Sequence, residues 1–166
     1  FSDSIISTAM STAMIFFIVL GAGFYNSFLA LSQVPQELSS FVVSQGFSPW
    51  FVLVLILVFY LIFGCLMDSL SMILLTIPIF FPVISALDFG MTHDHLAIWF
   101  GILVLIVVET GLIPPPVGMI LFIINAMDKQ TPIVETYKAV MFFITSDLIR
   151  VALLVAFPAI TLFLIT

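Results

Sequence analysis

The sequence predicts an all-α integral membrane protein, and three observations lead to that fold class. Of the 166 residues, 63% are hydrophobic and only 7% are charged, whereas soluble domains carry about 25% charged residues. The apolar residues gather in runs of about 20, which is the length of a transmembrane helix. One of these runs contains three consecutive prolines, so at least one helix must be discontinuous. With three basic residues in total, the chain is not expected to bind nucleic acid.

A first transmembrane helix is predicted over residues 1–31. Small and hydroxylated residues crowd its first half, and such residues let membrane helices pack closely. The chain begins at Phe1 without a basic segment, so we read no signal peptide there and expect a piece of a larger membrane subunit. The polar connection over residues 32–48 contains no Lys or Arg, which places it outside by the positive-inside rule.

Residues 49–87 form two apolar limbs joined by a short polar turn. Asp68 in this turn is suited to cap the second limb. The limbs either cross the bilayer completely or form a re-entrant hairpin whose tip stops inside the membrane. The first limb is about 25 Å long, the lower edge for spanning, and Pro78 and Pro82 are expected to interrupt the second limb. The residues alone favour neither arrangement.

A polar loop over residues 88–95 carries the sequence His93-Asp94-His95. Two imidazoles and a carboxylate could bind a metal, but no third or fourth ligand follows at a recognisable spacing. We therefore expect an ordinary solvated loop.

A discontinuous helix is predicted over residues 96–127. The prolines lack backbone donors and clash with the preceding turn, while Gly111 and Gly118 on either side permit unusual backbone angles. In lipid, an unwound backbone is tolerated only where protein or a wet cavity satisfies it. Glu109, near mid-depth, is costly in the membrane and by default functional. The break is therefore predicted to be a binding site, the alternative being a structural kink.

The loop over residues 128–138 holds two of the three basic residues and is therefore expected to be cytoplasmic. A last transmembrane helix is predicted over residues 138–165, which leaves the C-terminus outside. Asp147 and Arg150 lie three residues apart on one helix face, where they can pair. We interpret them as a structural or subunit-facing pair.

The hairpin tip and the broken helix are expected to meet near the middle of the membrane. A helix half that ends there presents carbonyls, which suit a cation, and a half that begins there presents amides, which suit an anion. This is the chemistry of a sodium-coupled carrier of anionic solutes. No nucleophile–base pair is visible, so an enzyme is not expected.

Two motifs resemble those of one transporter family. The stretch Glu109-Thr110-Gly111-Leu112-Ile113-Pro114-Pro115-Pro116-Val117-Gly118 resembles the "E-I-G-L-I-T-P-P-V-G" signature of TRAP (tripartite ATP-independent periplasmic) transporter large membrane subunits. Gly64-x-x-x-Asp68, followed by Ile77-Pro78-Ile79-Phe80-Phe81-Pro82, resembles the "G-x-x-x-D … P-I-x-x-P" stretch of the same family. The resemblance covers nearly the whole chain, as the C-terminal third or so of such a subunit. The chain departs from the pattern where Pro114 replaces Thr, Thr110 replaces an apolar residue and Ile120 replaces a common Asn.

The resemblance implies an elevator-type ion-transporter fold, in which this chain is most of the second inverted repeat and the 49–87 hairpin is re-entrant from the outside. Sodium would lie between the hairpin tip and the unwound stretch, largely on backbone carbonyls. The residues implied for sodium are Gly64, Asp68, Ser69, Gly111, Pro115 and Gly118. Those expected along the solute path are Glu109, Thr110, Pro114 and Pro116.

The family resemblance also implies partners and a location. The subunit would import carboxylate-bearing solutes, such as C4-dicarboxylates or sialic acids, across the bacterial inner membrane. It would work with a small membrane subunit and a periplasmic solute-binding protein. The alternatives are a related antiporter or carboxylate carrier that needs no binding protein, and a non-transporting membrane assembly subunit.

Overall fold

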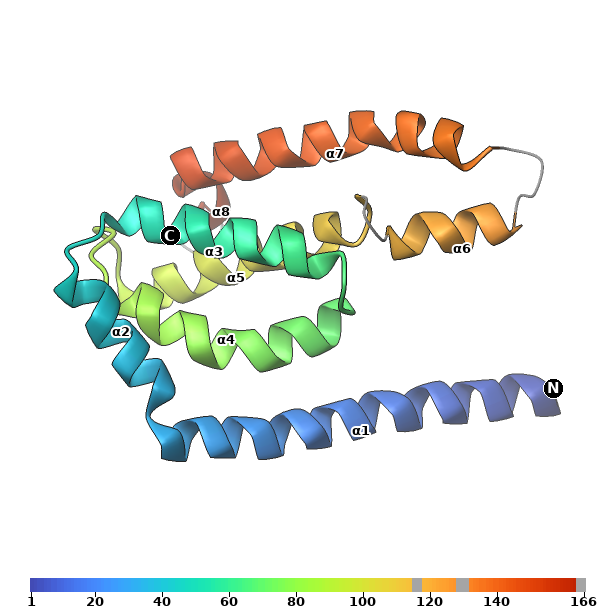
Figure 1. Cartoon of the computed structure of the whole chain (residues 1–166), viewed down its shortest axis with the longest axis horizontal. Coiled ribbons are helices and arrows are strands. Elements are labelled where there is room, and N and C mark those ends of the chain that lie inside the picture. The colour runs from blue at the N-terminus through green and yellow to red at the C-terminus, as the bar shows by residue number, and fades with distance from the viewer. Residues whose placement is uncertain (115–117, 128–131, 164–166) are drawn as a thin grey trace.

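The computed structural model describes residues 1–114, 118–127 and 132–163 (Figure 1). Within these ranges the chain is helical and contains no β-strand. The helices are α1 (Ser2–Ser32), α2 (Val34–Ser44), α3 (Pro49–Gly64), α4 (Ser69–Ser85), α5 (His93–Gly111), α6 (Met119–Met127), α7 (Ile133–Ala156) and α8 (Ala159–Leu162). Three of them, α1, α5 and α7, are long and apolar enough to cross a membrane. The chain is therefore an all-helical integral membrane protein.

Helix α5 is the centre of the packing. It contacts α3, α4, α7 and α8, and half of its most apolar 18-residue window is buried, against 6% for α1. Trp99, Leu103 and Val108 on α5 are completely buried. Since α5 is held on several sides, its neighbours fix the position of its C-terminal end in the bundle.

Helices α3 and α4 form an antiparallel hairpin whose turn, residues 65–68, lies beside the end of α5 (Figure 1). The 16 residues of α3 are about 24 Å long and the 31 residues of α1 about 46 Å. Helices α1 and α6 continue beyond the hairpin turn (Figure 1). The tip of the hairpin therefore lies beside the C-terminal end of α5, part-way along the length of α1 (Figure 1).

The expectation that Pro78 and Pro82 interrupt the second limb is wrong, because α4 is one continuous helix through both prolines. Pro78 has no N–H, so the carbonyl of Leu74 loses its helical donor. The Asn26 side chain of α1 donates to that carbonyl instead, with Nδ2 3.4 Å from Leu74 O. A neighbouring helix thus satisfies the backbone group that the proline frees, which is how membrane helices tolerate proline.

Two polar connections are also more helical than expected. The segment 32–48 contains α2, which begins after Gln33 in a left-handed conformation (φ 57°) and carries Pro35 in its first turn. Proline is well tolerated there because the first N–H groups of a helix have no intrahelical partner. In the loop predicted over 128–138, α7 already begins at Ile133, directly after Pro132.

The last helix, predicted over residues 138–165, is divided within the described residues. Helix α7 ends at Ala156, Phe157 leaves helical geometry (φ −127°, ψ 75°), and the short α8 follows. Pro158 cannot donate to the carbonyl of Leu154. The buried indole of Trp99 on α5 donates to it instead, with Nε1 2.9 Å from Leu154 O.

Candidate functional site

The hairpin and α5 touch backbone to backbone at two glycines. A Cβ atom added to Gly111 would lie 3.0 Å from Leu61 O and 3.1 Å from Gly64 Cα. A Cβ atom added to Gly64 would lie 3.1 Å from Gly111 Cα and 3.1 Å from Val108 O. Only glycine permits this approach, so the structure brings together two of the residues predicted for the site.

The C-terminal end of α5 presents carbonyls that lack ordinary helical donors. The N–H groups of Leu112 and Ile113 donate to the carbonyls of Glu109 and Thr110, each at 3.3 Å, and tighten the last turn. Pro115 and Pro116 lie outside the described residues, but as prolines they have no N–H to give to the carbonyls of Gly111 and Leu112. Oxygens of this kind are suited to a hard cation such as sodium.

Asp68 and Ser69 begin the second limb of the hairpin. The Asp68 carboxylate accepts the Ser71 N–H, with Oδ2 2.9 Å from the nitrogen, and so caps α4. Its side chain is exposed at the turn, whereas Ser69 is half-buried. The predicted capping role is confirmed, and the exposed carboxylate places a negative charge at the hairpin tip.

The remaining predicted residues differ in what they face. Glu109 is exposed on α5, whereas Thr110 is 2% exposed and its hydroxyl donates to Ile106 O at 2.7 Å. The hydroxyl proton of Thr110 is therefore used in a hydrogen bond within its own helix. Gly118 has φ 54°, and a Cβ atom there would lie 3.0 Å from both Ile113 O and Tyr137 Oη. Gly118 therefore packs against Ile113, just after α5, and against Tyr137 of α7. Pro114 is half-buried.

The sequence reasoning missed one pair of hydrogen-bonded hydroxyls in the hairpin. Tyr60 on α3 is fully buried, and its hydroxyl oxygen lies 2.8 Å from Thr76 Oγ1 on α4. The signal was present, because each is a lone hydroxyl within a strongly apolar run. A polar side chain within such a run needs a hydrogen-bond partner, and here the two hydroxyls are hydrogen-bonded to each other.

The comparison with protein families decides what kind of protein carries this site. Residues 2–160 match the family model described as "Tripartite ATP-independent periplasmic transporter, DctM component". The chain belongs to this TRAP transporter family. The resemblance inferred from the two motifs is therefore confirmed.

The names of three curated relatives of this TRAP family member mention three different solutes. The C4-dicarboxylate TRAP transporter large permease protein DctM of Pseudomonas aeruginosa is 34% identical over 91% of this chain and 34% of its own length. The sialic acid TRAP transporter large permease protein SiaM of Vibrio cholerae is 27% identical over 99% of this chain and 37% of its own length. The ectoine TRAP transporter large permease protein TeaC of Halomonas elongata is 30% identical over 95% of this chain and 35% of its own length.

The TRAP chain spans about a third of the length of these relatives. No solved structure matches it. The relatives are permease subunits of transporters and not enzymes, in agreement with the expectation from the sequence.

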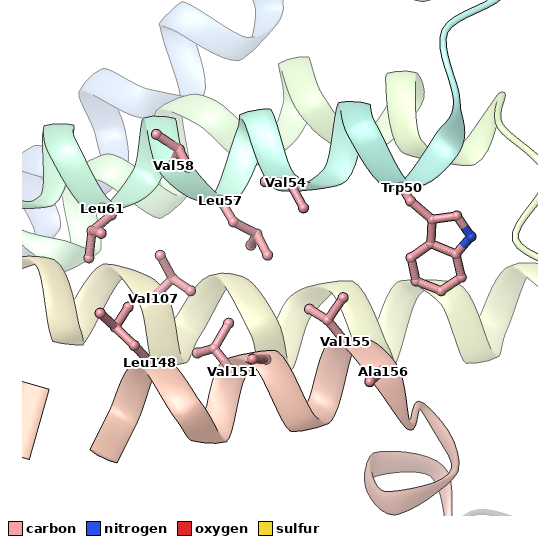
Figure 2. Close-up of a pocket in the computed structure, with 11 residues that line it drawn as sticks. Trp50, Val54, Leu57, Val58, Leu61, Val107, Leu148, Val151, Val155 and Ala156 are labelled. Carbon is pink, nitrogen blue, oxygen red and sulfur yellow. The ribbon is translucent and has the colours of Figure 1, made fainter. Parts of the chain in front are cut away.

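An apolar groove lies between α3, α5 and α7 of the chain (Figure 2). Its volume is about 500 Å³. Its lining residues are Trp50, Val54, Leu57, Val58, Leu61, Val107, Leu148, Val151, Ala152, Val155 and Ala156. Apart from the indole of Trp50 these side chains are hydrocarbon, so the groove offers nothing that would hold an ion or an anionic solute.

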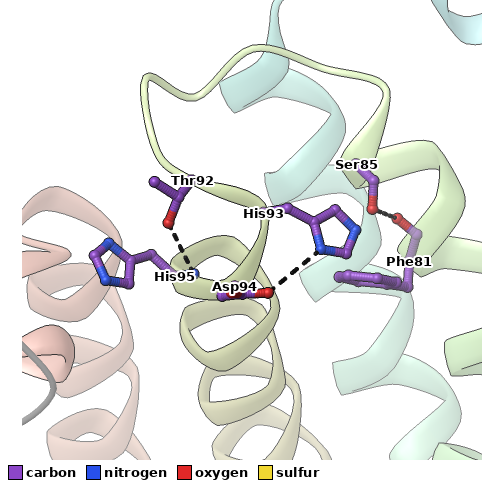
Figure 3. A network of polar contacts seen from close by, with 6 residues as sticks. All are labelled: Phe81, Ser85, Thr92, His93, Asp94 and His95. Carbon is purple, nitrogen blue, oxygen red and sulfur yellow. Dashed lines mark hydrogen bonds and ion pairs between the residues drawn. The ribbon is translucent and has the colours of Figure 1, made fainter.

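The segment His93–His95 is the first turn of α5 and not a loop, and it does not form a metal centre in the described part of the structure. His93 packs against the ring of Phe81, and its Nδ1 lies 3.9 Å from the Asp94 carboxylate (Figure 3). The His95 side chain points to the other side of the helix start, and Thr92 caps its backbone N–H at 3.4 Å (Figure 3). No group of three or more His, Cys, Asp or Glu side chains gathers among the described residues.

The charged pair on α7 forms as predicted. Arg150 Nη2 lies 2.9 Å from Asp147 Oδ1, and the two side chains are 55% and 30% exposed. The pair neutralises two charges on a helix that is otherwise apolar enough to span the membrane. It lies on a different helix from the glycine contact, and the interpretation as a structural or subunit-facing pair stays a prediction.

Proposed function

We propose that this chain is the C-terminal part of the large permease subunit of a sodium-coupled secondary transporter. The transporter imports carboxylate-bearing solutes that a periplasmic binding protein delivers, and it works with a small membrane subunit. The chain is most of the second inverted repeat of an elevator-type ion-transporter fold. The observation that carries the proposal is the contact of the hairpin tip with the interruption of α5 at Gly64 and Gly111.

We assign the coupling ion to the space between the tip and the interruption. Support comes from the carbonyls of Gly111 and Leu112, to which the following prolines cannot donate, and from the negative charge of exposed Asp68. The proposed sodium set is Gly64, Asp68, Ser69, Gly111, Pro115 and Gly118. Sodium bound there would fix the tip against α5 before the solute arrives.

The solute is assigned to the opposite side of the interruption, where α6 begins. The N-terminus of a helix carries a partial positive charge and free amides, which suit a carboxylate. Glu109, Thr110, Pro114 and Pro116 are proposed along the solute path. Because a glutamate repels a carboxylate and attracts a cation, Glu109 belongs on the ion side of that path.

The proposed topology places the hairpin as a re-entrant element from the outside of the bacterial inner membrane. Support comes from the length of α3, about 24 Å, and from the continuation of α1 and α6 beyond the hairpin turn (Figure 1). Loop 128–138, with Lys129 and Lys138, is then cytoplasmic and the C-terminus periplasmic.

Uptake in proteoliposomes tests this function. The full-length subunit is reconstituted with its small subunit, and the uptake of C4-dicarboxylates and sialic acids is measured with and without sodium and with and without the binding protein. We expect uptake to require both sodium and the binding protein. Uptake without the binding protein would indicate a simpler carrier, sodium-independent uptake would remove the coupling assignment, and no uptake of any anion would favour an assembly subunit.

A further inference from the structure

The two limbs of the hairpin are joined by a partly buried side-chain hydrogen bond, between Tyr60 and Thr76. The Thr76 hydroxyl oxygen lies 2.6 Å from Met72 O in its own helix and 2.8 Å from the Tyr60 hydroxyl. A threonine hydroxyl has one proton and can also accept. It therefore donates to Met72 O, and Tyr60 donates to it. Both hydroxyls are therefore satisfied within the hairpin.

Tyr60 also lies where α3 meets the interruption of α5. A Cβ atom added to Gly111 would be 3.3 Å from Tyr60 O and 3.0 Å from Leu61 O. Tyr60 thus reaches α4 through its hydroxyl and α5 through its backbone. Phe80 of α4 packs edge-on against the Tyr60 ring with 5.7 Å between centroids, but such packing tolerates sliding more readily than a hydrogen bond does.

We propose that Tyr60 and Thr76 are positioning residues for the sodium site, an inference that rests on the proposed function. Their hydrogen bond fixes the position of α4 along α3 and so holds the turn that follows Gly64 against Gly111. Neither side chain touches the ion. Without the bond, the tip occupies the assembled position for a smaller fraction of the time, and the apparent affinity for sodium falls by that fraction.

Two nearly isosteric substitutions remove the bond. Tyr60→Phe removes it alone, whereas Thr76→Val also removes the intrahelical bond to Met72 O. Tyr60→Phe and Thr76→Val each remove a hydroxyl and leave the apolar volume almost unchanged. Tyr25→Phe, on the partly exposed Tyr25 of α1, is the matched tyrosine control. Thr145→Val is the matched threonine control, because the exposed Thr145 donates only within its helix, to Met141 O at 2.8 Å.

The first measurement is the sodium dependence of uptake by the full-length subunit with its small subunit and binding protein. We expect Tyr60→Phe and Thr76→Val each to raise the sodium concentration for half-maximal uptake about fivefold. The maximal rate at saturating sodium should stay within about twofold. Because both substitutions remove the same bond, the double variant should shift no further than either single variant. The controls should follow the wild type.

A second measurement needs no transport. Cys65 follows Gly64 in the hairpin turn and is 5% exposed, so its alkylation rate reports how often the tip opens. In a full-length subunit that keeps Cys65 as its single cysteine, sodium should slow alkylation. Tyr60→Phe should shift the protecting sodium concentration by the same factor as in uptake.

Three results would overturn the inference. Unshifted sodium dependence in both variants, with a sodium-dependent wild type, would remove the positioning role and leave the proposed function intact. A lower maximal rate without a shift in either titration would indicate a purely structural role. Sodium-independent uptake and alkylation in the wild type would overturn the proposed function and this inference together.

Discussion

Helices α4 and α5 both meet prolines within an apolar run, and the outcomes are opposite. Helix α4 continues through Pro78 and Pro82, whereas α5 ends at Gly111 and α6 begins at Met119, on either side of the proline run. An isolated proline frees one carbonyl, and a neighbouring helix can supply the missing donor, as Asn26 does for Leu74. Three consecutive prolines remove the helical donors of three successive carbonyls, and a single side chain cannot replace them all, so the helix ends.

The end of α7 resembles α4, because a side chain of another helix donates to a carbonyl that a proline has freed. Trp99 serves the carbonyl of Leu154, which Pro158 frees, although the helix has already turned away at Phe157. Within the described residues, freed carbonyls therefore act as docking points between helices where one donor is within reach. Four substitutions test how far these helix contacts depend on the glycine contact and on the donors to freed carbonyls.

Gly111→Ala should have the largest effect, because it attacks the contact between the interruption and the hairpin. The new methyl would lie 3.0 Å from Leu61 O and 3.1 Å from Gly64 Cα, which are backbone atoms that cannot swing away. We expect a loss of about 1–3 kcal/mol in stability, measured by thermal unfolding in detergent, and loss of sodium-dependent uptake. The control is Gly101→Ala in the same helix, where nothing lies within 4 Å of the added methyl. Equal stability of the two variants would show that the glycine contact is not tight.

Trp99→Phe removes the donor to Leu154 O and some buried volume. Since Trp99 is fully buried, we expect a loss of about 2 kcal/mol in the free energy of unfolding, followed by circular dichroism. Pro158→Ala should not relieve this loss, because the non-helical Phe157 prevents a new N–H at position 158 from pointing at Leu154 O. If Pro158→Ala abolished the loss, the end of α7 would have to be helical without its proline.

The sequence predicts the class and family of this chain but not the fate of its individual prolines. Composition and the stretch 109–118 were sufficient for the membrane class and the TRAP family. The donor to the carbonyl that Pro78 frees is Asn26, 48 residues before Leu74, and that proximity exists only after α1 has packed on α4. Local propensity favours a break at Pro78, and tertiary contact overrides it.

The candidate site, like the fold, was predicted from the sequence only in part. The order of a hairpin followed by a broken helix predicted a meeting of the hairpin tip with the interruption, and Gly64 and Gly111 do touch. Tyr60 and Thr76 were not found, because a lone hydroxyl in an apolar helix indicates that it needs a partner but not which one. The roles of the predicted ion and solute residues stay predictions until transport is measured.

Asn26→Leu should destabilise the protein by about 1 kcal/mol, because the Leu74 carbonyl then has no helical donor. The loss is limited because Asn26 Oδ1 is itself buried without a partner in the described structure, so the substitution also removes an unsatisfied acceptor. In a Pro78→Ala background the alanine N–H can donate to Leu74 O within α4, and the loss should fall close to zero. An equal loss in both backgrounds would show that Asn26 acts through packing and not through the freed carbonyl.

Ser39→Ala should have the smallest effect, and it isolates the cause. Ser39 Oγ lies 3.4 Å from Pro82 O, the same distance that separates Asn26 from Leu74 O. Pro82 O, however, also accepts the Ala86 N–H at 3.2 Å, so it keeps a helical donor when the serine is removed. We expect a change below about 0.5 kcal/mol in the unfolding free energy. A loss as large as that of Asn26→Leu would mean that any side-chain donor to α4 matters equally, whether or not a proline has freed the carbonyl.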